Sequence, residues 1–289
     1  MLDFAFIPTP SNSFVSVGPL KIHFYALFII VGVIAAILIG QSRYQKIGGD
    51  PTEISDLAVY AIPAGVIGGR LYHVITSPEK YFGNGGNPID AFKIWNGGLG
   101  IWGAIALGAF AAYLFYKRGN RTKSFPEFAD VIAPGLLVAQ AIGRWGNWAN
   151  GELFGKPSTL PWSVKIPLAN RPSGFTNFET FHATFLYESI WCLAVAIFLL
   201  LRSNQIKFLT AKSGNVFLFY IMSYSLGRIW IEYLRIDDAN LIFGLCLNIW
   251  VSLVAIVIPA VLLIKNNRDR KSTRLNSSHS QQSRMPSSA

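Results

Sequence analysis

Charged residues are scarce in this chain of 289 residues. Asp, Glu, Lys and Arg together make up 14% of it, against roughly 25% in an average soluble domain. Hydrophobic residues make up 52%, and the mean hydropathy is +0.38. This balance excludes an ordinary soluble domain and predicts an integral membrane protein.

Cysteine and histidine are also rare. The two cysteines, Cys192 and Cys246, lie inside apolar stretches, where a free cysteine usually behaves as a small hydrophobic residue. The four histidines do not show the spacing of metal ligands. We therefore expect no disulfide framework and no metal site.

Long apolar windows are abundant instead. Each is about twenty residues long, which is enough for a helix to cross a hydrocarbon core of roughly 30 Å. The windows fall at about 22–40, 57–76, 97–116, 128–146, 182–201, 215–234 and 241–264. The sequence thus predicts an all-α polytopic membrane protein with seven transmembrane helices.

The basic residues between these windows indicate an orientation, because Lys and Arg near helix ends are retained on the cytoplasmic side. Alternate loops divide into two sets. The richer set holds Arg43, Lys46, Lys117, Arg118, Arg121, Lys123, Arg202, Lys207, Lys212, Lys265 and Arg268. The poorer set holds Lys21, Lys80, Lys93, Lys156, Lys165, Arg171 and Arg235, spread over longer loops. We expect the N-terminus outside and the C-terminus inside.

The long connections are predicted on the outer side. Residues 77–96 and 147–181 are rich in Pro, Gly and Asn, as irregular surface structure tends to be. Residues 1–268 should form one transmembrane domain, with 147–181 inserted as a small extracytoplasmic head of short strands. The segment 269–279, "DRKSTRLNSSH", resembles the translation of a sequencing-library adapter, so we expect 269–289 to be a non-native, disordered tail.

Charged side chains nevertheless occur inside or beside the predicted spans. Each costs at least ~2.5–3.5 kcal/mol at the bilayer centre, so such residues usually face a protein interior and pair with one another. Arg70, Arg144, Arg228 and Glu232 fall in the outer half or at the outer end of their windows, and Glu152 follows just beyond. Tyr25, His182, His23 and Glu188 also lie near outer helix starts. Charges gathered at one depth favour a polar cavity over ordinary anchoring at the membrane surface.

Each of these residues also has a simpler interpretation. Arg228 and Glu232 are spaced to pair along one helix face, and Arg70 could extend its side chain to the membrane surface. His182 could be a hydrogen-bonded structural histidine, and Tyr25 an aromatic of the interfacial belt.

Gly97 and Gly98 stand at a predicted helix start, where free N–H groups can receive an anion. Helix packing alone would explain these glycines equally well.

The most specific motif is "GRWGNWANGELFG" at residues 143–155. It resembles the signature of bacterial prolipoprotein diacylglyceryl transferases, and the positions that match are Gly143, Arg144, Gly146, Asn147, Trp148, Asn150, Glu152 and Gly155. Further segments are similar in order and spacing: "HFYALFI" with Tyr25, "GGRLYHV" with Arg70, "FHATFLYES" with His182, Tyr187 and Glu188, and "GRIWIEYLRID" with Arg228, Glu232 and Arg235. The resemblance extends from about residue 16 to 265.

The resemblance implies a seven-helix enzyme of the bacterial cytoplasmic membrane. Such an enzyme moves the diacylglyceryl part of phosphatidylglycerol onto the thiol of the lipobox cysteine in a preprolipoprotein signal peptide, forms a thioether and releases glycerol phosphate. Its active site is expected toward the extracytoplasmic face. The sequence departs from the family at Asn96, where a histidine discussed as a base often stands, and asparagine takes up no proton at neutral pH. The proton acceptor is therefore unassigned.

The expected site has two groups of residues. Arg144 and Arg228 are predicted to hold the phosphate and stabilise the transition state, with Asn147 and Glu152 orienting Arg144 and binding glycerol hydroxyls, and with Glu232 fixing Arg228. The remaining predicted substrate-binding residues are Tyr25, Arg70, Asn96, Gly97, Gly98, Asn150, Gly155, His182 and Arg235.

Two other functions stay open from the residues alone. A transporter of an anionic solute would also collect arginines between helices, although such proteins commonly show internal repeats and a midplane site, and no repeat is evident here. Another lipid-headgroup enzyme would be expected to carry a His/Asp or Ser/His constellation, and none stands at suitable spacing.

Overall fold

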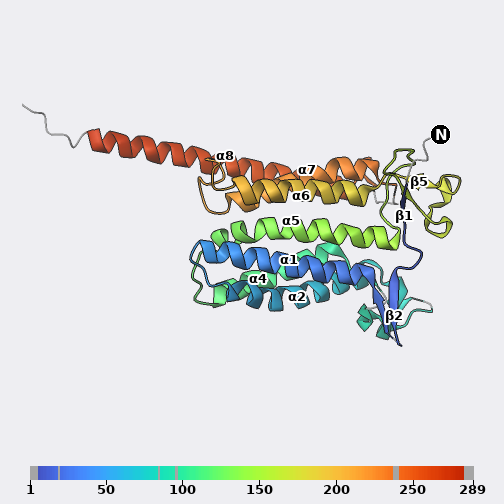
Figure 1. Cartoon of the computed structure of the whole chain (residues 1–289). Helices are drawn as coiled ribbons and strands as arrows, with labels where there is room; N and C mark the ends of the chain where they lie inside the picture. The colour runs from blue at the N-terminus through green and yellow to red at the C-terminus, as the bar shows by residue number, and fades with distance from the viewer. Residues whose placement is uncertain (1–5, 19, 84, 95–96, 237–240, 283–289) are drawn as a thin grey trace, which may run out of the picture. The chain divides into compact units, whose positions relative to one another are not determined.

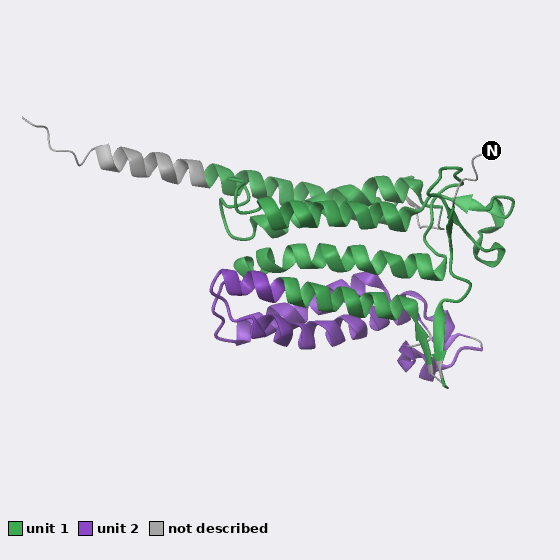
Figure 2. Cartoon of the chain, viewed as in Figure 1, with its two compact units in different colours: residues 1–39, 126–289 green, residues 40–125 purple. Residues whose placement is uncertain are grey.

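A computed structural model describes residues 6–18, 20–83, 85–94, 97–236 and 241–282 (Figure 1). The chain divides into two compact units (Figure 2). The first consists of residues 1–39 and 126–289, and the second of residues 40–125.

The described residues form seven helices of 18 residues or more, and each overlaps one predicted apolar window. They are α1 (Phe24–Lys46), α2 (Thr52–Thr76), α4 (Ile101–Arg118), α5 (Phe125–Asn150), α6 (Thr184–Arg202), α7 (Asn215–Leu234) and α8 (Leu247–Gln282). Five of them, all except α4 and α7, are long and apolar enough to span a membrane. The chain is therefore a mostly helical, polytopic membrane protein.

The two exceptions have a simple physical origin. Helix α4 is only 18 residues long and ends in Lys117 and Arg118. Helix α7 carries Arg228 and Glu232 in its second half. Charged residues lower the mean hydropathy of both helices, and in α7 those charges belong to the candidate site described below.

Helix α5 is the central helix of the first unit. Of its apolar window 44% is buried, compared with 11% for α1. Ala133, Leu137 and Ala141 of α5 pack in one hydrophobic cluster with Cys192 and Leu199 of α6, and Figure 1 shows α5, α6 and α7 running alongside one another. Because α5 ends within this packed unit, the signature segment at its end is held firmly.

The first part of α1 packs closely on α5 through glycine. A Cβ on Gly32 would lie 3.0 Å from the carbonyl oxygen of Ala139, and one on Gly135 would lie 2.9 Å from that of Ala36. Such close approach of helix backbones is typical of membrane helices. The other faces of α1 expose Ile30, Val31 and other large apolar side chains, as a surface facing lipid would.

A small sheet joins the first unit next to the end of α5. It consists of β1 (Ile7–Pro8), β4 (Val164–Lys165) and β5 (Thr180–Phe181), in the order β1-β4-β5, with β1 parallel and β5 antiparallel to β4. Phe154, Val164, Ile166, Phe181, Ala183 and Phe185 form its core. Short 3₁₀ turns at Leu168–Asn170 and Ser173–Phe175 complete it.

The boundary expected for this head needs a correction. Helix α5 continues to Asn150, so residues 147–150 are helical and the irregular segment begins after them. The N-terminal strand β1 also belongs to the sheet, which the sequence did not indicate. Two further hairpins pair β2 (Phe14–Val17) with β3 (Leu20–His23) and β6 (Leu241–Ile242) with β7 (Leu245–Cys246).

The second unit is built on the pair α2 and α4. The short helix α3 (Glu79–Phe82) and the 3₁₀ turn η1 (Pro88–Phe92) lie between them in the sequence. Gly68 and Gly103 let the two long helices touch, since a Cβ on either would lie within 2.3 Å of the other's carbonyl oxygen. Helix α4 begins at Ile101, with Gly100 at its N-cap. The predicted helix start at residue 97 is therefore wrong, and Gly97 and Gly98 precede the helix.

Helix α8 includes residues 269–282 within its bounds. The non-native origin of residues 269–289 stays a prediction.

Candidate active site

Four helices of the first unit bring polar residues to one end, and three of them contribute charges. Arg144 lies near the end of α5, Glu188 near the start of α6, Arg228 and Glu232 near the end of α7, and Asn248 at the start of α8. Helices that alternate in direction bring the end of one beside the start of the next. The charges that are far apart in the sequence therefore meet in space.

Glu188 is at the centre of this cluster. Arg144 Nη2 lies 2.6 Å from Glu188 Oε1, and Arg228 Nη1 lies 3.0 Å from Glu188 Oε2. The hydroxyl of Tyr224 also donates to Oε1, at 3.1 Å. The residue is only 3% exposed, so one buried carboxylate joins two guanidinium groups from different helices.

Glu232 forms a second junction one turn beyond Arg228. Its Oε2 accepts hydrogen bonds from Arg228 Nη2 at 2.8 Å and from Arg235 Nη1 at 3.2 Å. Its Oε1 accepts from Asn248 Nδ2 at 2.8 Å. Both carboxylate oxygens are thus engaged, and Glu232 holds Arg228 and Arg235 together.

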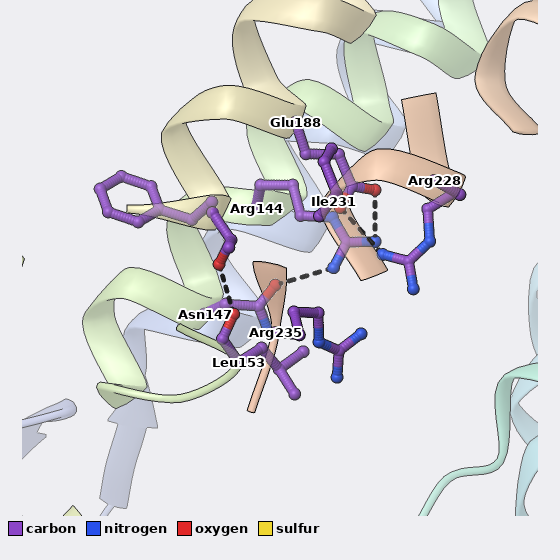
Figure 3. Close-up of a pocket in the computed structure, with 9 residues that line it drawn as sticks. Arg144, Asn147, Leu153, Glu188, Arg228, Ile231 and Arg235 are labelled. Atoms are coloured by element: carbon purple, nitrogen blue, oxygen red, sulfur yellow. Dashed lines mark hydrogen bonds and ion pairs between the residues drawn. The ribbon is translucent and has the colours of Figure 1, made fainter. Parts of the chain in front are cut away.

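A small pocket opens between these groups (Figure 3). It contains about 200 Å³ of space free of protein atoms, a figure that includes space open to solvent. Its walls are formed by Arg144, Asn147, Leu153, Thr184, Phe185, Glu188, Arg228, Ile231 and Arg235. Three guanidinium groups and one carboxylate line it, so the pocket suits a small anionic group.

The signature segment supplies a hydrogen-bonded chain at one side of the pocket. Arg144 Nη1 donates to Asn147 Oδ1 at 3.3 Å, and Asn147 Nδ2 donates to Glu152 Oε1 at 3.0 Å. Asn150 Nδ2 reaches the same oxygen at 3.2 Å. A Cβ on Gly146 would lie 2.5 Å from the ring of Tyr25, so that glycine admits the tyrosine beside the chain.

The backbone after α5 turns sharply into the pocket. Gly151 has φ +60° and Leu153 has φ +57°, and the Thr184 hydroxyl donates to the Leu153 carbonyl. A positive φ is uncommon for a residue other than glycine and is often found at functional sites. Gly155 then packs tightly, since a Cβ there would lie 2.8 Å from Cβ of His182.

Arg70 has a different environment in the second unit. Its Nε donates to the carbonyl of Ala91 at 2.8 Å, and its Nη1 donates to those of Gly97 and Gly98 at 2.5 and 3.0 Å. Its Nη2 donates to the carbonyls of Asp90 and Lys93. Every nitrogen of this guanidinium group therefore contacts the backbone of the connection before α4. Asn96 lies outside the described residues.

His182 follows strand β5, before helix α6 begins. Its Nδ1 lies 3.1 Å from the hydroxyl of Tyr187. Burial lowers the pKa of His182, and the nearby positive charge of Lys156 lowers that pKa further. The imidazole is consequently kept neutral at neutral pH.

The sequence interpretation did not assign several residues of this cluster. Glu188 and Tyr224 contact the arginines, Asn248 donates to Glu232, and Leu153 lines the pocket. A signal existed for Glu188, because a carboxylate within the apolar run of α6 is costly in a membrane. Tyr224 and Asn248 gave no such signal, since polar residues of this kind also occur at helix ends and in interfacial belts.

Fold and site together define a multi-pass membrane protein with a cluster of largely buried arginines around a small pocket. Residues 12–265 match the family model described as prolipoprotein diacylglyceryl transferase. This chain belongs to that family.

Curated relatives are similar over most of the chain, and the three below are each named phosphatidylglycerol–prolipoprotein diacylglyceryl transferase. The one from Streptomyces griseus is 46% identical over 264 residues, covering 91% of this chain and 78% of the relative. The one from Cutibacterium acnes is 48% identical over 259 residues, covering 89% and 86%. The one from Bifidobacterium adolescentis is 44% identical over 287 residues, covering 95% and 84%.

Proposed function

We propose that this protein transfers the sn-1,2-diacylglyceryl group of phosphatidylglycerol to the thiol of the lipobox cysteine of preprolipoproteins. The reaction forms a thioether and releases glycerol phosphate, and it is the first step of bacterial lipoprotein maturation. Family membership over residues 12–265 and the names of the relatives support this activity.

The observation that carries the mechanism is the approach of two guanidinium groups to one acceptor. Arg144 and Arg228 both reach Glu188, at 2.6 and 3.0 Å, so both can reach one phosphate placed there. Attack of the thiolate on the glycerol carbon breaks the C–O bond and leaves negative charge on the departing phosphate oxygens. Positive groups fixed in advance at low dielectric stabilise that charge.

The lipid would bind with its headgroup in the pocket and its acyl chains in the bilayer. The pocket is too small for a whole lipid, so the phosphate with part of its glycerol would enter among the three arginines that line it. The acyl chains would remain in the bilayer, against apolar side chains such as those exposed on α1 and α8. The lipid would enter sideways between helices.

The neighbouring polar residues would set the geometry of the arginines. Asn147 and Glu152 orient Arg144 and are available to glycerol hydroxyls, with Asn150 supporting Glu152. Glu232 fixes Arg228 and Arg235. Tyr25 contacts the glycerol from its place beside Gly146.

The peptide thiol needs no metal or organic cofactor. A free cysteine has a pKa of about 8.5, so a few per cent is thiolate at neutral pH, and nearby cations raise that fraction. The arginine cluster would supply this activation.

The membrane arrangement completes the proposal. All seven long helices span the bacterial cytoplasmic membrane, with the N-terminus outside and the C-terminus inside. The distribution of Lys and Arg supports this orientation, which turns the arginine cluster and the head toward the extracytoplasmic face. Preprolipoproteins would then reach the site from the leaflet into which they are exported.

The test uses the purified protein in phosphatidylglycerol vesicles with a lipobox peptide. Mass spectrometry should detect a peptide heavier by one diacylglyceryl group, together with glycerol phosphate. Arg144→Ala and Arg228→Ala should abolish this product, whereas Arg202→Ala, at an exposed site at the other end of α6, should retain it.

Near wild-type transfer by both site variants would refute the assigned roles. Uptake of glycerol phosphate by the vesicles, without any peptide product, would favour the anion transporter instead.

A further inference from the structure

We propose that Glu188 is an internal stand-in for the lipid phosphate. Its carboxylate lies between Arg144 and Arg228, and the phosphate of the incoming lipid displaces it. This inference rests on the proposed function and adds a residue that competes with the substrate for the same two arginines.

The geometry supports this role because carboxylate and phosphate offer similar acceptors to guanidinium groups. Each oxygen of Glu188 meets a different arginine, Arg144 at 2.6 Å and Arg228 at 3.0 Å. The carboxylate thus bridges the two groups in the way that two oxygens of a phosphate would. Both arginines and Glu188 itself line the pocket, so a ligand there meets all three.

Glu232, in the same cluster, differs from Glu188 in its partners and in its position relative to the pocket. It accepts hydrogen bonds from the Asn248 amide, Arg228 and Arg235. Arg228, which makes the shorter of the two arginine bonds, lies one helical turn away on the same helix. Glu232 does not line the pocket. Glu188 instead joins side chains of two other helices across the pocket. The exchangeable partner of the arginines is therefore Glu188.

Displacement keeps the overall charge of the cluster balanced. Three arginines and two glutamates give the cluster one excess positive charge, and a phosphodiester brings one negative charge. After the exchange, the Tyr224 hydroxyl, 3.1 Å from Oε1, remains available to the released carboxylate. A buried ion pair is strongly destabilised when one partner is removed, so a resident carboxylate also keeps the arginines in place until the lipid arrives.

The competition has a measurable cost in affinity. A ligand that binds only the open arrangement has its apparent dissociation constant raised by the inverse of that arrangement's population. If Glu188 is bound to the arginines about 90% of the time, phosphate binds roughly tenfold more weakly than it would without the competition.

The decisive variant is Glu188→Gln, which keeps the size of the side chain and removes its charge. Thermal stability of the detergent-solubilised protein is measured against increasing sn-glycerol 1-phosphate. We expect the dissociation constant to fall about tenfold from wild type. In the transfer assay KM for phosphatidylglycerol should fall while kcat changes less than KM, because a ground-state competitor has been removed. The matched control is Glu179→Gln, an exposed carboxylate paired with Lys165, and it should behave as wild type.

A second variant covers the case in which Glu188→Gln does not fold. Glu188→Asp keeps the charge but shortens the side chain by one methylene, so its carboxylate competes less well for the two arginines and should lower the dissociation constant by a smaller factor. Unchanged or weaker glycerol phosphate binding in the variants that fold overturns the proposal, as does a loss of kcat without a change in KM. If the wild type yields no lipidated peptide, the proposed function fails, while the binding titration still decides the role of Glu188.

Discussion

Two arginine environments in this protein differ in what the guanidinium groups bind. In the second unit, Arg70 donates to five backbone carbonyls between Asp90 and Gly98. In the first unit, Arg144 and Arg228 bind carboxylate side chains at the wall of a pocket. Arg70 and Arg228 both lie in the second half of a long, largely apolar helix, so position along a helix does not separate them.

The difference lies in whether the acceptor can be exchanged. Backbone carbonyls are fixed by the fold, so an arginine that satisfies them holds a loop in place. A carboxylate on a side chain can move aside for another anion, so an arginine that binds it remains available to a ligand. We infer that Arg144 and Arg228 act on substrate and that Arg70 acts chiefly on the loop before α4.

The largest expected effect comes from Arg144→Lys and Arg228→Lys. Lysine keeps the charge but lacks the planar fork that binds two acceptors. Loss of one preorganised group at a developing anion costs about 100-fold or more in rate. Turnover of the lipobox peptide in phosphatidylglycerol vesicles measures it, with Arg202→Lys as the control. Retention of more than a tenth of the wild-type kcat would show that charge alone suffices.

Asn147→Ala should have the next largest effect. It removes one acceptor of Arg144 and one donor to Glu152. A hydrogen bond to a charged group contributes about 1.5–3 kcal/mol. We expect kcat/KM to fall about tenfold or more, in the same assay. Asn177→Ala in the head is a matched control. An unchanged kcat/KM would mean that Arg144 keeps its position without Asn147.

Arg70→Lys should affect stability more than activity, in contrast to Arg144→Lys. Several carbonyls lose their donor, and an unsatisfied buried group costs about 1–3 kcal/mol. The thermal midpoint in detergent should fall and residues 77–98 should become easier to cleave by protease, while kcat falls only a few-fold. A loss of kcat as large as that of Arg144→Lys, with unchanged stability, would assign Arg70 to the substrate instead.

The smallest effect concerns pH and His182. Burial and Lys156 lower its pKa in the folded protein, so the unfolded chain binds the proton more readily. Stability from the neutral imidazole is therefore complete above the unfolded pKa of about 6.5 and is lost as pH falls below it. Thermal midpoints at pH 7.5 and 5.5 test this: His182→Gln should differ from wild type more at pH 7.5. An equal difference at both values would contradict it.

Much of the fold could be predicted because membrane insertion depends on local composition. Each long helix overlaps a predicted apolar window, although α4 begins at Ile101 instead of residue 97, and α5 continues to Asn150. Helix ends depend on contacts such as the Arg70 bonds to Gly97 and Gly98, and hydropathy does not register them. Strand β1 is only two residues long, too short for an alternating pattern.

The sequence by itself determined that this chain is a polytopic membrane protein of one family, because apolar windows and the segment 143–155 are properties of contiguous residues. It also pointed to Arg144 and Arg228 as candidates for the site, since charges in apolar helices are costly wherever they occur. Only the tertiary structure decided which acceptor each arginine binds. Arg144, Glu188 and Arg228 are each separated by 40 or more residues, and their meeting depends on how α5, α6 and α7 pack, which no local pattern encodes.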